Sequence, residues 1–239
     1  MLKQEIIKRS PIRILEKSIQ GGLGKGNLGV FVARKGVGKT ACLVHFATDN
    51  LLQNHKALHI SFSDDPQHIE HWYTQVFHEI SRAYKLEGAM DIYEEIIRNR
   101  LILHFKRSGM QLDAVQSSID RLIRDSDFSP RIIIVDGFCF DKTPAADLTF
   151  WKNLAAAHDA EIWFSATLLA DYPGTEAQGI PAPISPFAVD FAVVVLLIAH
   201  REFIELKLLK DHNAKDVEKL RLKLDPKTLL ISKDRKSVV

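Results

Sequence analysis

Short, continuous apolar runs recur along the chain. Runs of this kind, rich in β-branched residues and bounded by turn residues, predict buried strands of a parallel sheet, which are apolar on both faces. The clearest run is Arg131 to Asp136, in which three isoleucines and a valine precede an aspartate. The other strands predicted in this way cover residues 28–32, 56–63, 101–105 and 161–167.

The segments between these runs favour helices. In residues 112–124, for example, apolar side chains recur at the spacing of one helix face. Asp65 followed by Pro66 is typical of a helix start, with aspartate as the N-cap and proline at the first helical position. The predicted helices are a segment opened by Lys39 and Thr40, then 67–86, 89–98, 112–124 and 145–158, together with parts of 3–18, where Pro11 is a break.

The last quarter of the chain has a different pattern. Four strand-like segments follow one another without helices between them, at 190–198, 202–209, 219–224 and 228–232. We therefore expect an α/β fold, with a central, mostly parallel sheet flanked by helices and extended by antiparallel C-terminal strands. Because we see no linker, we expect a single domain, with an N-terminal extension at 1–18, a core at 19–231 and a tail at 232–239.

Composition narrows the function classes only slightly. The net charge of +2 gives no strong overall attraction to nucleic acids or membranes, and 46% apolar with 26% charged residues is ordinary for a globular protein. The longest apolar run, Phe191 to Ala199, is too short to span a bilayer. Two cysteines, Cys42 and Cys139, form no disulfide framework, which fits a reducing, cytoplasmic location.

One stretch carries specific chemistry. The predicted strand 28–32 is followed by a short loop, Ala33 to Gly38, and Lys39 and Thr40 open an apolar, helix-like segment. This order of elements is the context of a phosphate-binding loop, in which backbone N–H groups and the helix N-terminus face phosphate oxygens. The predicted nucleotide-binding residues are Ala33, Arg34, Lys35, Gly36, Val37, Gly38, Lys39, Thr40 and Ala41. The alternative is a chance Gly-Lys-Thr in an ordinary strand-to-helix turn.

A carboxylate completes this candidate site. Asp136 ends a predicted central strand of the same sheet, where it would join Thr40 in holding Mg²⁺. The alternative interpretation is a surface acid at the end of a strand. The sequence thus predicts ATP and Mg²⁺ as ligands.

These stretches resemble the RecA-like P-loop ATPases, in the branch that contains the DnaB-type helicases and the KaiC-type and RadA-type ATPases. "GGLGKGNLGVFVARKGVGKTA" is similar to the family's lead-in and Walker A motif, and "RIIIVDGF" to Walker B. "LHISFSDDPQHI" is similar to the second strand of KaiC-type proteins, and "EIWFSATLLA" resembles the sensor strand. "LKLLKDHN" is similar to the Lys-x-Arg element, which in the family reaches a neighbouring subunit's γ-phosphate. The resemblance therefore implies a homo-oligomer, of which a hexamer is one form.

The chain departs from the family at two catalytic positions. Ser63 stands where the family usually has a glutamate that orients the attacking water, and only Asp64 and Asp65 follow it. His212 stands where the family has its arginine, two positions after Lys210. The resemblance thus implies catalytic roles for Asp64, Lys210 and His212, with intact ATP binding and slow hydrolysis. We expect a nucleotide-dependent switch or assembly factor.

Two other hypotheses stay open. A DNA-acting ATPase of the replication or recombination type would follow from the resemblance, but residues 171–186, where the family places a DNA-facing loop, contain no lysine or arginine. A strand-gripping loop should be basic. The third hypothesis is a scaffold that binds nucleotide only for stability or not at all.

Overall fold

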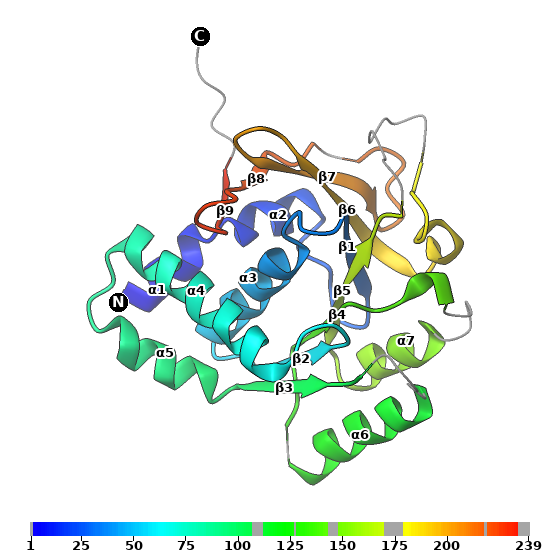
Figure 1. Cartoon of the computed structure of the whole chain (residues 1–239), viewed down its shortest axis with the longest axis horizontal. Coiled ribbons are helices and arrows are strands. Elements are labelled where there is room, and N and C mark those ends of the chain that lie inside the picture. The colour runs from blue at the N-terminus through cyan, green and yellow to red at the C-terminus, as the bar shows by residue number, and fades with distance from the viewer. Residues whose placement is uncertain are drawn as a thin grey trace.

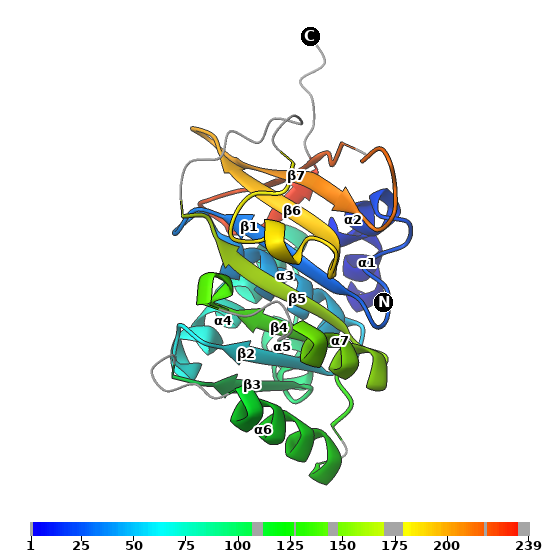
Figure 2. The same cartoon turned by 90° about the vertical axis from the view of Figure 1, so that its right-hand side faces the viewer.

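The computed structural model describes residues 2–106, 112–126, 128–142, 148–169, 179–217 and 219–233. The strands in these residues form one sheet, seen in Figure 2 from the face that α6 and α7 cover, in the order β3-β2-β4-β5-β1-β6-β7-β8-β9. The strands are β1 (Leu28–Ala33), β2 (Ala57–Ser61), β3 (Arg100–His104), β4 (Ile132–Asp136), β5 (Glu161–Thr167), β6 (Phe191–Ala199), β7 (Ile204–Asp211), β8 (Leu222–Leu224) and β9 (Ile231–Lys233).

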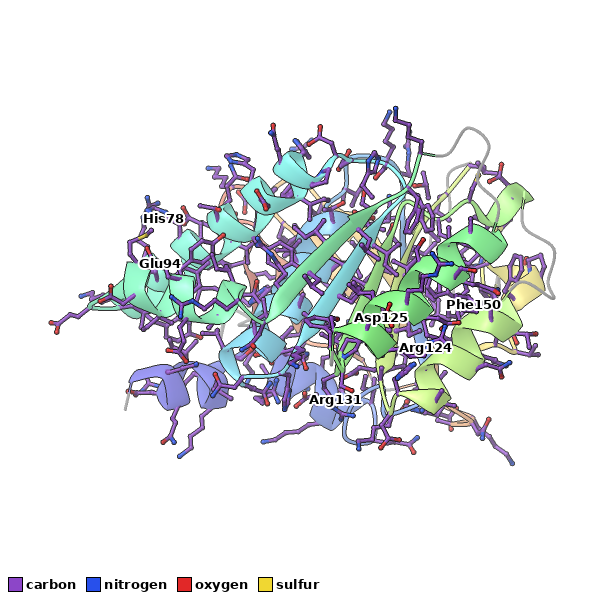
Figure 3. The ribbon with its side chains drawn as sticks, turned by 90° about the horizontal axis from the view of Figure 1, so that it is seen from below. His78, Glu94, Arg124, Asp125, Arg131 and Phe150 are labelled. Atoms are coloured by element: carbon purple, nitrogen blue, oxygen red, sulfur yellow. The ribbon has the colours of Figure 1, made fainter. Side chains whose placement is uncertain are left out.

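Helices cover both faces of this sheet (Figures 1 and 2). The first face carries α1 (Leu2–Arg9), α2 (Ile12–Ser18), α3 (Lys39–Leu52), α4 (Pro66–Tyr84) and α5 (Ala89–Ile97). The second carries α6 (Leu112–Asp125) and α7 (Leu148–Ala157). In the view from below, His78 and Glu94 mark the first group of helices, whereas Arg124, Asp125 and Phe150 mark the second (Figure 3).

Successive residues of the central strands enter two different cores. In β4, Ile132 and Ile134 pack with the helices of the first face, while Ile133 and Val135 pack with those of the second. This alternation follows from the twofold period of a strand and explains why the run is apolar at every position.

The predicted α/β architecture is confirmed, with one correction. The strands from β3 to β6 in sheet order are parallel, and β7, β8 and β9 are antiparallel to their neighbours. The first of the four C-terminal strands was expected in the antiparallel extension, but β6 pairs in parallel with β1. The segment 179–190 before it, with its short 3₁₀ helix at Ser185–Phe187, covers part of the second face, and Ile184 and Phe187 enter that core.

Aromatic packing fixes α3 against the centre of the sheet. Phe31 of β1 stacks on Trp163 of β5 at 5.1 Å between ring centroids, and Phe46 of α3 meets both rings edge-on. A Cβ on Gly29 would lie 2.7 Å from the Trp163 ring, so glycine leaves the space that this indole fills. Because α3 begins directly after the loop that follows β1, this packing also fixes the loop.

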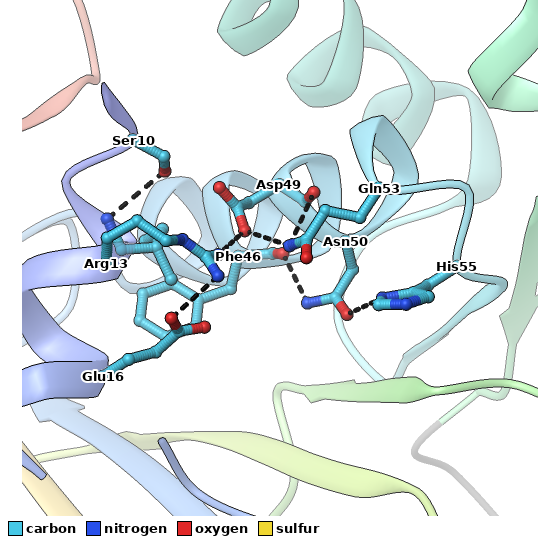
Figure 4. A network of polar contacts seen from close by, with 9 residues as sticks. Ser10, Arg13, Glu16, Phe46, Asp49, Asn50, Gln53 and His55 are labelled. Carbon is cyan, nitrogen blue, oxygen red and sulfur yellow. Dashed lines mark hydrogen bonds and ion pairs between the residues drawn. The ribbon is translucent and has the colours of Figure 1, made fainter. Parts of the chain in front are cut away.

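The predicted N-terminal extension packs on the body of the fold. Ile6, Ile12 and Leu15 are buried in the same core as α3. A group of polar side chains also joins the two parts. We call this group the α2–α3 junction; it consists of Ser10, Arg13, Glu16, Asp49 and Gln53 (Figure 4). The Arg13 guanidinium donates to the buried Asp49 carboxylate and forms an ion pair with Glu16 at 2.7 Å.

In the described part of the chain, no helix combines the length and apolar character needed to cross a membrane.

Candidate functional site

A cleft with a volume of about 730 Å³ lies at the carboxyl ends of the parallel strands. Open α/β sheets bind their ligands at this edge. The lining comes from the loop after β1 and the first turn of α3, the turn after β2, the segment after β4, the end of β5, and residues of β7, β8 and the turn after β8. We call residues 34–38, between β1 and α3, the glycine loop.

Two glycines give this loop its shape. Gly36 and Gly38 have φ angles of +82° and +105°, in the left-handed region that favours glycine. Gly38 directly precedes α3. A Cβ on Gly38 would lie 2.6 Å from Cδ2 of Leu224, so a side chain there would collide with β8. The loop thus depends on glycine both for its backbone turn and for its contact with β8.

Lys39 lies at the base of the loop and points back to it. Its ammonium donates to the carbonyl oxygens of Ala33 at 3.1 Å and Arg34 at 3.0 Å. Burial lowers the pKa of Lys39, and the nearby Asp136 carboxylate opposes that shift. A cation withdrawn from water is therefore held over the cleft by two neutral acceptors, which an anionic ligand could replace.

Thr40 and Asp136 meet, as the sequence predicts. The Thr40 hydroxyl donates to Oδ2 of Asp136 at 2.7 Å, and Asp136 is 3% exposed. The hydroxyl of Ser165 in β5 donates to the other carboxylate oxygen and accepts a hydrogen bond from the Gly137 N–H at 2.9 Å. Both oxygens of this carboxylate are thus oriented.

Ser63 and Asp64 both line the cleft. The strand β2 ends at Ser61, whose hydroxyl donates to the Asp64 carbonyl and accepts from the Asp64 N–H, at 2.7 and 2.9 Å. Residues 62–65 therefore form a turn, and the alternation of side chains along a strand does not turn Asp64 away. Gly137 leaves room here, since a Cβ on it would lie 2.9 Å from the Ser63 side chain.

Lys210 and His212 lie at the opposite end of the sheet. Asp211 pairs with Val193, which pairs with Gly29 near the start of β1, whereas the glycine loop follows the end of β1. The Lys210 ammonium donates to the Ala188 carbonyl at 2.7 Å. The His212 ring nitrogens contact the Asp211 carboxylate at 2.7 Å and the Leu23 carbonyl at 3.1 Å. Within one chain these two side chains do not join the cleft.

The predicted nucleotide-binding residues differ in whether they line the cleft. Lys35, Gly36, Val37, Gly38, Lys39 and Thr40 line the cleft, as does Asp136. Ala33 and Ala41 are fully buried and support the loop from below, while Arg34 is exposed. Residues 171–178, most of the segment compared with a DNA-facing loop, lie outside the described residues, as do Arg235 and Lys236 of the predicted tail.

Sequence reasoning missed several groups of cleft residues, including residues 137–141 after β4. Ser165 carries a sequence signal, because it is a polar residue inside the predicted strand 161–167; the register that sets Phe164 beside Val135 then brings it to Asp136. Trp72 of α4 and an apolar group at the far end of the cleft were also missed. That apolar group, which we call the apolar end, consists of Ile204, Leu224, Pro226 and Leu229. No local signal marks it, because it depends on the order of β6, β7 and β8 in the sheet.

No protein-family model matches the chain, and no curated protein matches it.

Proposed function

We propose that this protein binds a nucleoside triphosphate, foremost ATP, together with Mg²⁺, in the cleft of a RecA-like P-loop fold. One observation carries the proposal: a loop with two left-handed glycines opens a helix at Lys39, and the next residue, Thr40, hydrogen-bonds an aspartate at the end of a central strand. A chance Gly-Lys-Thr would not be expected to bring all these parts to one edge of a sheet.

The phosphate groups would be bound by the loop and the start of α3. N–H groups at a helix N-terminus carry partial positive charge and form a ready site for anions. Lys39 adds a full charge, and its two present acceptors are neutral carbonyls. Charged acceptors form stronger hydrogen bonds with an ammonium, so an exchange of the Ala33 and Arg34 carbonyls for phosphate oxygens is favourable.

Thr40 and Asp136 fit a magnesium site because a hydroxyl and a carboxylate are the hard oxygen donors that this ion prefers. The described residues contain no group of three or more His, Cys, Asp or Glu side chains that could hold a metal. An ion here would therefore take further ligands from phosphate and water, as Mg²⁺ commonly does. When bound, the ion would neutralise charge on the phosphates. Ser165 orients the Asp136 carboxylate toward Thr40.

The residues of the same cleft lead us to expect slow hydrolysis of the bound nucleotide. A water attacking the terminal phosphate needs a group that orients it and accepts its proton. Ser63 offers only a hydroxyl, and Asp64 is the one carboxylate in the turn after β2 that lines the cleft. We expect turnover well below the common enzyme range of roughly 1 to 10³ s⁻¹ and a role as a nucleotide-dependent switch or assembly factor.

Calorimetric titration with ATP tests the binding proposal, with and without Mg²⁺. Lys39→Ala should weaken binding by roughly tenfold or more, because it removes charge-assisted hydrogen bonds. Lys25→Ala is the matched control, since Lys25 is exposed and pairs with Asp159 outside the cleft. Equal ATP affinities for the wild type and Lys39→Ala would contradict the proposal.

Self-association is a second part of the proposal, suggested by Lys210 and His212. These residues lie too far along the sheet to act on the cleft of their own chain, so a catalytic role requires a neighbouring copy. Light scattering at high protein concentration, with a non-hydrolysable ATP analogue and Mg²⁺, should report an oligomer. A monomer under these conditions would remove both residues from the mechanism. DNA-stimulated hydrolysis would instead favour the DNA-acting alternative.

A further inference from the structure

A histidine lies beside the Asp64 carboxylate at the edge of the cleft. The Nε2 atom of His68 is 3.9 Å from Oδ2 of Asp64. The two residues are four positions apart, a separation that brings side chains together on one face of a helix. Because Asp64 directly precedes the N-cap of α4 and His68 lies in the first turn, the start of this helix sets their approach.

The backbone around this pair is fixed on both sides. The Ser61 hydroxyl donates to the Asp64 carbonyl at 2.7 Å and accepts from the Asp64 N–H at 2.9 Å. Asp65 caps α4, and its carboxylate accepts the His68 N–H at 3.0 Å. The distance between the carboxylate of Asp64 and the imidazole of His68 therefore depends mainly on the rotation of these two side chains.

Trp72 restricts the rotation of the imidazole. It follows His68 by another four residues, and the two rings meet edge-to-face with 6.2 Å between their centroids, a favourable aromatic contact. The indole is half-buried, packs against the first-face core and lines the cleft. His68 thus lies between the Asp64 carboxylate and the Trp72 indole, both of which line the cleft.

We propose that His68 is a positioning residue for Asp64, which it holds at the cleft so that the carboxylate can orient the water that attacks ATP. The inference rests on the proposed function and deepens it, because it assigns a partner to the carboxylate of the turn after β2. Asp64 lines the cleft with His68 already beside it, so the pairing does not withdraw the carboxylate from the cleft. With Oδ2 facing the imidazole, Oδ1 is the oxygen that would accept the hydrogen bond of the water.

An aspartate in this position needs such a partner. The Asp64 side chain is 37% exposed, so water competes for its oxygens, and it is one methylene shorter than a glutamate. A base acts only when it lies within hydrogen-bond reach of the proton that it accepts, and a fixed orientation raises the rate. The N–H at Nε2 exists in the protonated imidazole and in one neutral tautomer, so His68 can donate to the carboxylate without carrying a charge.

The step that Asp64 assists is the hydrolysis of the terminal phosphate. The water oxygen forms a bond to the terminal phosphorus of ATP, and the bond from that phosphorus to its bridging oxygen breaks. The electron pair of the broken bond leaves with ADP. The proton of the water passes to the Asp64 carboxylate, which returns it to solvent. His68 takes no part in this transfer and acts only through the orientation of Asp64.

Steady-state phosphate release with ATP and Mg²⁺ tests this assignment. His68→Ala should lower kcat by about threefold, the size expected for the loss of a partly exposed side-chain pair, and leave KM and the calorimetric ATP affinity unchanged. His71→Ala is the matched control. His71 is also exposed on α4, so the change in helix propensity is the same, but it forms no ion pair with Asp64 and does not line the cleft.

A double-mutant cycle separates positioning from a structural role. In the Asp64→Ala background, His68→Ala should cause no further loss of kcat, because the carboxylate on which it acts is gone. Single-turnover measurements over hours keep these low rates measurable. A residue that merely supports α4 would lower kcat by the same factor in both backgrounds.

Each contrary result identifies what has failed. If ATP does not bind, the proposed function is wrong and this inference falls with it. If ATP binds but the wild type releases no phosphate, or if His68→Ala leaves kcat unchanged or raises it, the inference is overturned and the nucleotide site stands. An equal loss of kcat in the presence and absence of the Asp64 carboxylate would likewise overturn it.

Discussion

The cleft and the α2–α3 junction each hold a cation near carboxylates that are withdrawn from water, but they lie in very different spaces. Lys39 and Asp136 border a cleft of about 730 Å³, whereas the hollow beside Asp49 measures about 10 Å³, room for one water molecule at most. In the cleft, the Lys39 ammonium donates its two hydrogen bonds among the described residues to neutral carbonyls. At the junction, Arg13 already contacts two carboxylates.

The comparison shows that residue type alone does not separate a binding site from a structural contact. At both places burial shifts a pKa away from its ordinary value: it lowers that of Lys39 and raises that of Asp49. The available space and the strength of the existing partners distinguish them. We therefore expect substitutions in the cleft to change ligand affinity and substitutions at the junction to change stability.

The largest expected effect is at Asp49. Its side chain is 3% exposed and pairs with Arg13, and Asp49→Ala would leave that guanidinium without its buried partner. Breaking a buried ion pair costs about 3 to 5 kcal/mol, and because Arg13 retains Glu16 we expect the lower limit of about 3 kcal/mol. Urea denaturation measures this loss. Asp49→Asn, which keeps an acceptor for Arg13 and Gln53, should lose less, and ATP affinity should stay unchanged in both variants.

Lys39→Ala should weaken ATP binding and leave the stability of the fold nearly unchanged. Since burial already disfavours the charge on Lys39, its removal should leave the unfolding free energy within about 0.5 kcal/mol of the wild type in the absence of nucleotide, the range of most surface changes. Its roughly tenfold or greater loss of ATP affinity corresponds to about 1.4 kcal/mol or more of binding free energy. A loss of stability like that of Asp49→Ala would make Lys39 a structural residue and remove the contrast between the two regions.

The next prediction concerns the rate of hydrolysis in the cleft. Ser63→Glu should raise ATP turnover by about tenfold or more, because a positioned base contributes about 10² to 10⁴. Ser63 is exposed at the turn after β2, so a longer side chain fits there without a core rearrangement. Phosphate release measures the rate, and Asp64→Ala should lower it if Asp64 orients the water. Wild-type turnover of tens per second, unchanged by Asp64→Ala, would contradict this description of the site.

The sequence was sufficient for the elements that depend on local pattern. Continuous apolar runs located β1 to β5, and the Asp65-Pro66 pair located the start of α4, where the Asp65 carboxylate accepts the His68 N–H at 3.0 Å. The meeting of Thr40 and Asp136 could also be predicted, because both follow strands of one parallel sheet and so reach the same edge.

Features that depend on distant pairings could not be predicted. Leu224 reaches Gly38 only because β8 is added after β7 at the edge of the sheet, so no pattern near either residue reveals the contact. Asp49 looks like a solvated acid on a helix and becomes buried only when α2 packs against α3. The direction of β6 could not be predicted either, because an apolar run of this kind fits a parallel or an antiparallel strand equally well.

The smallest expected effect is a pH dependence from the α2–α3 junction. Burial raises the pKa of Glu16 to about 7, with Arg13 opposing the shift and Asp49 and Glu161 adding to it. An unfolded chain would have the ordinary value of 4.5, so between about pH 4.5 and 7 the folded protein holds a proton that the unfolded chain has released. This contribution to stability is fully present below pH 4.5 and is lost as the pH rises through 7.

Glu16→Gln isolates this effect, because it removes the titrating group and keeps the shape of the side chain. The variant should be more stable than the wild type at pH 8, where the wild type holds a partly buried charge, and the difference should shrink toward pH 5. Since 32% of the Glu16 side chain is exposed, solvent screens the interaction and the effect should be much smaller than that of Asp49→Ala. Melting temperatures of both proteins from pH 5 to 8 measure it. Parallel curves would mean that the ion pair with Arg13 outweighs burial and keeps Glu16 charged throughout.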